Sequence, residues 1–250
     1  MAVTIKSERE IELMRQAGKY IAMAHAEVEK EVKPGMSTYQ IDKIGEEIIR
    51  SYGCIPTCLG YEGYPASLCI SVNDEVVHGI PRKDRFVENG DIVSLDFCLS
   101  YKGYQSDCAR TLAIGEISDD AKQLIEVTKQ CFFEGIKYAK EGCHLYQISA
   151  AINDYADKFG YGVVRDLVGH GIGREMHEDP QIPNFRQRRR GMKLQAGMTL
   201  CIEPMINMGR ADVAFMDDDW TVVTDDGSLA AHYENTVLIT KGEPEILTLI

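Results

Sequence analysis

The chain lacks the features that mark several common classes of protein. It has 27 Lys and Arg residues against 39 Asp and Glu, which gives a net charge of −12 at pH 7. This shortage of positive charge argues against broad binding to nucleic acid or anionic membranes, because both require basic surfaces. The chain also lacks a continuous apolar run of the roughly 18 residues that span a bilayer. Its opening, MAVTIKSERE, has no apolar signal-peptide core. We therefore expect a cytoplasmic protein with neither DNA nor membrane as a partner.

Paired cysteine motifs and low-complexity linkers are also missing. The eight cysteines show no CxxC spacing, and Cys54 and Cys58 have no second pair to complete a zinc site. We expect reduced, mostly buried thiols, as in other cytosolic proteins. A length of 250 residues with 44% hydrophobic content is typical of a globular chain. We predict one domain over 1–250, with internal halves of roughly 1–113 and 114–250.

What the chain does contain is a repeated segment. Residues 88–96 read ENGDIVSLD and residues 195–203 read QAGMTLCIE, and a shift of 107 positions aligns them without a gap. The same shift places residues 33–53 on 140–160, where Lys, Gly, Tyr, Gln and Ile coincide. One offset that serves two separate stretches indicates a duplicated half-domain. Asp96 and Glu203 would then occupy matched strand positions and face a shared pseudo-twofold axis.

Signals for secondary structure repeat in the same order. Capping residues and apolar periodicity predict helices over about 7–32, 37–53, 118–140 and 146–159. The stretches 66–112 and 161–250 contain the β-branched residues and glycine turns that are typical of strands. Two helices followed by strands, twice over, predict an α+β fold. We expect an antiparallel sheet that carries the helices on its outer face.

Four acidic residues stand out on the strand-like segments. Asp96 ends IVSLD, and Asp107 follows a Lys-Gly turn that can fold the two side by side. Glu203 ends LCIE in the second half, and Glu234 lies in HYENTVLI. Burying such charges is costly unless they are paired or bind a metal. We interpret them as two matched pairs, one in each half, whose mutual repulsion a cation would relieve.

Histidines accompany these acids. His170 lies in GHGIG, among glycines that allow close approach of other groups, and VHGI around His78 resembles it. His177 follows seven residues after His170, whereas we interpret His25 and His144 as structural. One imidazole with four carboxylates suits Mn, Fe or Co better than it suits a structural zinc. Four carboxylates are too many for one catalytic ion with an open position, so they predict two ions bridged by shared carboxylates and a water.

These segments resemble the pita-bread metallopeptidases, and among them the type I methionine aminopeptidases. The resemblance covers nearly the whole chain. Its main carriers are YEGYPASLCISVNDEVVHGIP (61–81), GDIVSLD (90–96), GHGIGREMHEDPQIPN (169–184), GMTLCIEPM (197–205) and HYENT (232–236). The resemblance implies a pita-bread fold with internal pseudo-twofold duplication. It also implies removal of the initiator methionine from nascent polypeptides by a metal-activated hydroxide, with a small second residue preferred. Only 26 residues separate His177 from Glu203, which fits the short bacterial-like type I form.

The resemblance also implies roles for individual residues. Two divalent ions (Co, Mn, Fe or Zn) would be held by Asp96, Asp107, His170, Glu203 and Glu234. Asp107 and Glu234 would bridge the ions, and Glu203 or the activated hydroxide would manage the proton. His177 would stabilise the developing oxyanion on the scissile carbonyl, and His78 would contact the peptide nitrogen of the second residue.

A pocket for the methionine side chain follows from the same resemblance. It would be formed by Cys58, Tyr61, Tyr64, Cys69, Tyr104, Met176 and Trp220. Contacts between sulfur and aromatic rings suit a thioether. Met176 stands where the family commonly has phenylalanine, which makes a softer wall. His232 shares a strand face with Glu234, and it fits both a supporting contact to that acid and exposure at the surface.

Two other functions compete with this reading. A proline-specific aminopeptidase shares the fold but usually has an additional N-terminal domain, for which this chain has no room. A non-catalytic pita-bread binding protein would have lost ligands, and all five are present here. We expect a monomer. The basic run RQRRR at 186–190 is interpreted as a solvated loop, with transient contact to ribosomal RNA near the nascent-chain exit as the alternative.

Overall fold

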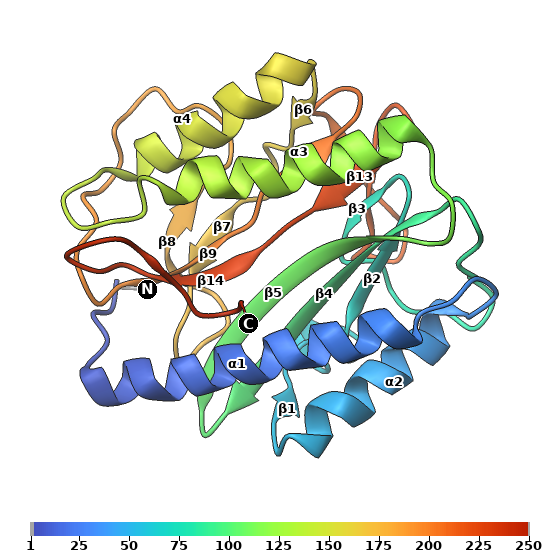
Figure 1. The fold of residues 1–250 in the computed structure, drawn as a ribbon, viewed down its shortest axis with the longest axis horizontal. Helices are drawn as coiled ribbons and strands as arrows, with labels where there is room; N and C mark the ends of the chain where they lie inside the picture. The colour runs from blue at the N-terminus through green and yellow to red at the C-terminus, as the bar shows by residue number, and fades with distance from the viewer. Residues whose placement is uncertain (1–2, 250) are drawn as a thin grey trace.

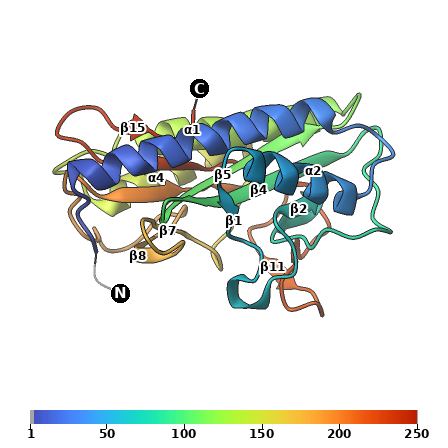
Figure 2. The ribbon, with the colours of Figure 1, turned by 90° about the horizontal axis from the view of Figure 1, so that it is seen from below.

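Four long helices cover one side of a β-structure. The computed structural model describes residues 3–249. Its helices are α1 (Glu8–Glu31), α2 (Thr38–Ser51), α3 (Asp119–Ile136) and α4 (Leu145–Ala156). Figures 1 and 2 show all four on the same face of the strands. The four predicted helices are confirmed, although α3 and α4 end about one turn earlier than expected.

The strands form four antiparallel groups. The first half contributes β1 (Ile55–Pro56), β2 (Cys69–Val72), β4 (Ile92–Tyr101) and β5 (Tyr104–Ala113). The group in the second half contains β7 (Gly169–Gly171), β8 (Glu178–Ile182), β9 (Thr199–Ile202), β14 (Asn235–Leu238) and β15 (Glu245–Ile246). One smaller group contains β6 (Gly162–Val163), β10 (Met205–Asn207) and β13 (Ala230–His232). The other contains β3 (Glu75–Val77), β11 (Val213–Phe215) and β12 (Val222–Thr224). Short 3₁₀ turns lie at η1 (Tyr61–Gly63) and η2 (Asp157–Phe159). The predicted α+β pita-bread architecture is confirmed.

The duplication is visible in local structure at the 107-residue offset. Gln40 caps the start of α2 by accepting from the backbone N–H of Ser37 at 2.8 Å. Gln147 does the same for His144 at the start of α4, also at 2.8 Å. Isolated bridges join Ser37 to Phe86 and His144 to Lys193, which differ by the same offset. Equivalent helices thus begin with the same hydrogen bonds, which explains why Gln recurs in both halves.

The central strands also correspond, and their register fixes which residues are equivalent. In the first half Asp96 on β4 lies opposite Ala109 on β5, and Cys98 lies opposite Asp107. In the second half Asn235 lies opposite Ile202 and Met205 opposite His232, and this register places Glu203 opposite Glu234.

This register confirms one expected pair and corrects the other. Asp96 and Glu203 are equivalent, as predicted. The position of Asp107, however, corresponds to His232, and that of Glu234 corresponds to Ala109. A two-residue offset keeps a side chain on the same face of a strand, so Asp107 and Glu234 can still face one another without being symmetry equivalents.

The two halves meet where β5 lies beside β14. The backbone N–H of Glu234 donates to the Ala109 carbonyl at 3.0 Å. The hydroxyl of Thr236 donates to the Asp107 carbonyl at 2.9 Å. This junction brings one acid from each half to the centre of the molecule.

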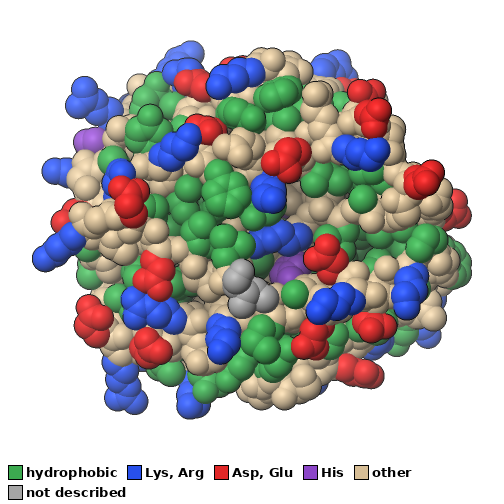
Figure 3. Space-filling view, viewed as in Figure 1, with side chains coloured by type: hydrophobic (Ala, Val, Ile, Leu, Met, Phe, Trp, Pro, Cys, Tyr) green, Lys and Arg blue, Asp and Glu red, His purple; other side chains and the backbone are tan. Residues whose placement is uncertain are grey.

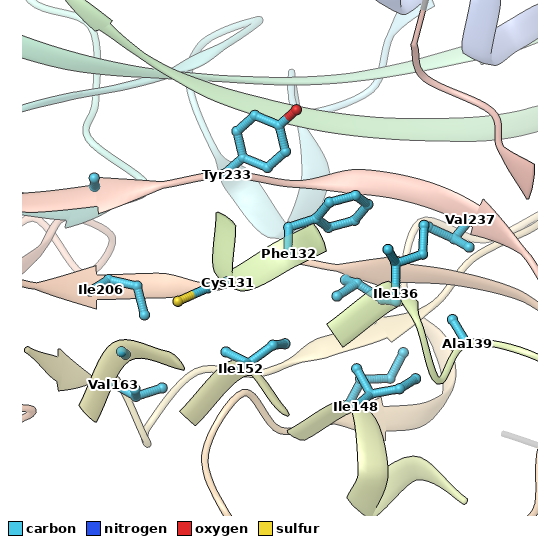
Figure 4. Close-up of a cluster of buried hydrophobic side chains, with 14 of the residues drawn as sticks. Cys131, Phe132, Ile136, Ala139, Ile148, Ile152, Val163, Ile206, Tyr233 and Val237 are labelled. Atoms are coloured by element: carbon cyan, nitrogen blue, oxygen red, sulfur yellow. The ribbon is translucent and has the colours of Figure 1, made fainter. Parts of the chain in front are cut away.

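Each half has its own apolar core between helices and strands. In the second half, Phe132 from α3 packs with Tyr233, Val237 and the α4 residues around Ile148, as Figure 4 shows. The corresponding cluster of the first half packs α1 and α2 on β2 and β4. Burying each large side chain contributes roughly 1.5–3 kcal/mol, so these clusters hold the strands rigidly beneath the site.

The helix-covered face is evenly mixed in charge. Figure 3 shows acidic and basic side chains interspersed over it, with apolar side chains between them. Within residues 3–249, no helix is both long and apolar enough to cross a membrane.

Candidate metal centre and cavity

Nearly all residues singled out from the sequence gather around one cavity of about 440 Å³. Its walls come from strands and loops, and within residues 3–249 no residue of α1–α4 lines it. The helices cover one face of the strands and therefore support the site from behind (Figure 2).

The five predicted metal ligands converge on this cavity. His170 Nε2 lies 3.5 Å from Glu203 Oε1 and 3.8 Å from Asp107 Oδ2. Asp107, His170 and Glu234 each offer a ligand atom within 4.8 Å of the others, and Asp96 lies within the same range of Asp107. The strand pairs β4–β5 and β9–β14 create this arrangement, because each presents acids toward the junction of the halves.

Buried carboxylate oxygens in this group have no hydrogen-bond partner. Asp96 Oδ1, Asp107 Oδ1 and Glu234 Oε1 are all in this state. Burial raises the pKa of Asp107 to about 7. Burial, followed by repulsion from Asp107, raises the pKa values of Asp96, Glu203 and Glu234 well above their ordinary range. Such a cluster is stable as carboxylates only with compensating positive charge, so the donor set fits divalent cations.

The orientation of His170 supports the same conclusion. Its Nδ1 lies 2.8 Å from the carbonyl oxygen of Gly171, and because a carbonyl only accepts, Nδ1 carries the proton. The neutral ring then directs the lone pair of Nε2 toward the carboxylates of Asp107 and Glu203. A lone pair facing two carboxylates is repulsive unless a cation lies between them. This backbone contact is the kind of outer hydrogen bond that orients histidine ligands of metals.

Two further histidines line the cavity without belonging to the carboxylate group. His177 Nδ1 lies 2.6 Å from the Tyr61 hydroxyl, which orients the ring. His78 has a φ of 59°, in the left-handed region, and its ring lies 6.2 Å from that of Trp220. Burial lowers the pKa of His78 to about 4. Burial also lowers the pKa of His177, so both rings favour the neutral imidazole.

Six of the seven predicted pocket residues form an apolar wall beside the carboxylates. The lining includes Cys58, Tyr61, Tyr64, Cys69, Met176 and Trp220. The rings of Tyr64 and Trp220 meet edge to face at 5.0 Å. The Tyr64 hydroxyl donates to the backbone carbonyls of Leu68 and Gly79, at 3.1 and 2.9 Å. This fixed wall of sulfur and aromatic groups fits a thioether side chain.

Tyr104 is the exception, and its predicted place in this pocket is wrong. It does not line the cavity. Its hydroxyl donates to Glu10 of α1 at 2.9 Å, and the guanidinium of Arg174 lies 4.7 Å from its ring centroid. Tyr104 is the first residue of β5, and it packs there with Ile11 and Met14 of α1.

Two further residues lie near the acids: Cys98, which was assigned no role from the sequence, and His232, for which two readings were open. Cys98 lines the cavity beside Asp96 and Asp107. Its spacing from Asp96 in the sequence could have revealed this position, since residues two apart on a strand share a face. His232 is only 2% exposed, and its Nε2 lies 3.8 Å from Glu203 Oε2 and 4.0 Å from Glu234 Oε2. Of the two readings of His232, contact with the acids is correct and surface exposure is wrong.

Other sequence features lie away from the cavity. The basic run at 186–190 is a largely exposed loop in which Arg186 pairs with Asp154 of α4 and donates to the Tyr146 hydroxyl at 3.2 Å. His25 stacks on Phe97 inside the first core, as expected for a structural histidine. All eight cysteines are free, and seven of them are buried, as predicted.

Comparisons with known proteins agree with this geometry. Residues 12–241 match the model of metallopeptidase family M24. A methionine aminopeptidase of Clostridium acetobutylicum is 54% identical over 247 residues, which are 99% of each chain. The crystal structure of a methionine aminopeptidase from Thermotoga maritima superposes over the full length of both chains with a TM-score of 0.97 and 43% identity.

A more distant neighbour bears on the proline-specific alternative. An Xaa-Pro dipeptidase of Bacillus anthracis has a TM-score of 0.78 and 26% identity, and the match covers 98% of this chain but only 61% of that one. The shared part is the fold, whereas full-length similarity is to the methionine aminopeptidases. The chain belongs to metallopeptidase family M24 and, within it, to the methionine aminopeptidases.

Proposed function

We propose that this protein removes the N-terminal methionine from newly made polypeptides, using two divalent cations. The observation that carries the proposal is the group of buried, unpartnered carboxylates beside a sulfur-rich and aromatic wall in one cavity. The acids fit cations, the wall fits a methionine side chain, and both line the same cavity. We further propose that the protein acts as a cytoplasmic monomer on nascent chains.

The ligands divide into a shared pair and two flanking groups. Asp107 and Glu234 lie at the junction of β5 and β14, where they would be shared between the ions. His170 Nε2 lies 3.5 Å from Glu203 Oε1, so these two would complete the ligands of one ion, whereas Asp96, which lies near Asp107, would bind the other. Bound cations would supply the Lewis acidity that activates a water for attack on the methionine carbonyl.

Protein groups would bind and orient the substrate around that centre. His177 would donate a hydrogen bond to the scissile carbonyl from the ring nitrogen that does not face Tyr61. His78 would hold the following peptide nitrogen, and Glu203 would move the proton. The wall around Trp220 and Met176 would receive the thioether and exclude water from it. We expect a small second residue to be preferred, because the chain must leave past His78.

Peptide cleavage tests the proposal directly. Metal-free protein would be titrated with Fe, Mn, Co and Zn without oxygen, and release of methionine from Met-Ala-Ser would be followed. Asp107→Asn and His170→Ala should abolish release. Asp84, which is exposed, and His144, which is half-buried at the start of α4, lie outside the cavity and supply matched controls, since Asp84→Asn and His144→Ala change the same types of side chain elsewhere.

Three outcomes would argue against the proposal. Full activity in both site variants would exclude the metal centre as the source of catalysis. Faster cleavage of Xaa-Pro peptides than of Met-Ala peptides would favour the proline-specific alternative. Absence of divalent metal binding under all conditions would favour a non-catalytic binding protein.

A further inference from the structure

Cys98 lies between the two acids of the first half. It follows Asp96 by two residues on β4 and lies opposite Asp107 on β5. Asp96, Cys98 and Asp107 each offer one ligand atom, and these three atoms lie within 4.8 Å of one another. All three residues line the cavity, so a cation that enters it can reach them.

The ionisable groups around this thiol are the thiol of Cys58 and the carboxyls of Asp107 and Asp96. Among residues 3–249, no Lys or Arg lines the cavity. Asp96 Oδ1 and Asp107 Oδ1 remain without hydrogen-bond partners although they are buried. Three electron-rich atoms that face one space without a protein cation have the donor geometry of a metal site.

We propose that Cys98 is a sulfur ligand for the cation held by Asp96 and Asp107. This inference rests on the metal centre of the proposed function and adds a donor to it. On binding, the Cys98 thiol would lose its proton to solvent and its sulfur would bond to the ion, so one proton leaves this thiol when the position beside Asp96 fills. A thiolate is soft, and it shifts selectivity toward thiophilic ions such as Zn, Cd and Co and away from Mn.

A second thiol lies near the acids, but its environment differs. Cys201 Sγ lies within 4.8 Å of ligand atoms of Asp107, His170 and Glu234. It does not line the cavity, and it faces the Thr236 hydroxyl at 3.8 Å. It also packs in the apolar cluster of α1 with Ile11 and Met14. Cys201 is therefore a packing residue behind the site.

Cobalt spectroscopy of the whole protein separates these cases. Metal-free protein would be titrated with Co(II) without oxygen, and the near-ultraviolet sulfur-to-cobalt charge-transfer band would be recorded with the visible bands of bound cobalt. The wild-type protein should show both. Cys98→Ser should lose the charge-transfer band and keep the visible bands. Cys201→Ser should keep both, as should Cys143→Ser, a control thiol outside the cavity.

Affinities provide a second measurement. Cys98→Ser should weaken Cd binding by at least about ten-fold and change Mn binding by less than about three-fold, because only the softer ion depends on sulfur. If Cys98→Ser does not fold, cadmium NMR of the wild-type and Cys201→Ser proteins tests instead whether a thiolate binds the ion. A thiolate ligand moves the cadmium resonance far downfield of positions set by oxygen and nitrogen.

The results also distinguish failure of this inference from failure of the proposed function. Bound cobalt without a charge-transfer band in the wild type would overturn the role of Cys98 and leave methionine release intact. A band that persists in Cys98→Ser and disappears in Cys201→Ser would show that Cys201 supplies the sulfur ligand and would overturn the inference. Absence of any metal binding would overturn both.

Discussion

Replacing Asp107 by asparagine should stabilise the metal-free protein while abolishing its metal-dependent activity. Burial raises the pKa of Asp107 to about 7 from an ordinary value of 3.8. A carboxyl whose folded-state pKa is raised contributes full stability below its unfolded-state pKa and loses that contribution as pH rises through the folded-state value. A difference of about three pKa units, at about 1.4 kcal/mol each, makes ionisation of Asp107 cost on the order of 4 kcal/mol above pH 7.

Urea denaturation at two pH values measures this cost. The free energy of unfolding of metal-free wild-type protein should fall by a few kcal/mol between about pH 5 and pH 8. The raised pKa values of Asp96, Glu203 and Glu234 should increase this fall. Asp107→Asn should flatten this dependence and be the more stable protein at the higher pH. A cation at 100 times its dissociation constant should restore about 2.7 kcal/mol to the wild type and nothing comparable to the variant.

The matched control is Asp84→Asn, which removes a carboxylate that is 83% exposed. It should leave both the pH dependence and the metal response unchanged. The reasoning would be refuted if metal-free wild-type protein were equally stable at both pH values. It would also be refuted if Asp107→Asn were less stable than the wild type at the higher pH, since the carboxylate would then be stabilised by something other than a cation.

Further predictions concern residues around and away from the cavity. Tyr61→Phe removes the hydroxyl that orients His177 and should lower kcat for Met-Ala-Ser by about ten-fold, with little change in KM. An unchanged kcat would show that other contacts hold the His177 ring. Tyr104→Phe should leave kcat/KM for methionine peptides unaltered and cost about 1 kcal/mol of stability, because it breaks only the hydrogen bond to Glu10. A selective loss of activity on methionine peptides would place Tyr104 in the methionine pocket after all. Gly18→Ala should lower the melting temperature despite the better helix propensity of alanine, because the new Cβ would lie 2.2 Å from the Leu247 carbonyl oxygen. A rise in melting temperature would mean that the C-terminal segment moves aside at little cost.

Much of the fold could be predicted because the signals are local and repeated. Helix starts are set by side chains three residues away, such as Gln40 and Gln147, and these are visible as sequence patterns. The placement of the acids on strand-like segments is equally local. What converts them into a site is the contact between β5 and β14, which joins residues more than 120 positions apart. Here the family resemblance supplied what periodicity could not.

Failures of prediction occurred where a side chain could turn to either of two environments. Tyr104 is the first residue of β5, directly after the hairpin turn that follows β4. Its contact with Glu10 depends on how α1 packs across the sheet, and no local pattern encodes that. Cys98 was set aside for a different reason. A search for paired cysteine spacing cannot find a thiol whose partners are carboxylates on the same and the neighbouring strand.

The duplication explains where ligands can lie, but not which ligands occur. The position of Asp107 in the second half is held by His232, and the position of Glu234 in the first half is held by Ala109. His170 lies opposite Cys201, and the equivalent residue of the first half is Ser71, opposite Ser94. The expected likeness of His170 to His78 is therefore one of sequence only, because His78 follows β3.

Each departure from symmetry changes the chemistry of one side of the centre. Histidine at position 170 gives the second half an imidazole nitrogen, whereas serine at position 71 uses its hydroxyl to accept from the N–H of Gly79 at 3.1 Å. Cysteine at position 98 gives the first half a thiol where Met205 stands in the second. If two cations bind as proposed, a symmetric scaffold would present nitrogen to one of them and sulfur to the other. Because these donors differ in softness, the two positions should fill with different affinities, and the order of filling in a cobalt titration should differ between wild-type protein and Cys98→Ser.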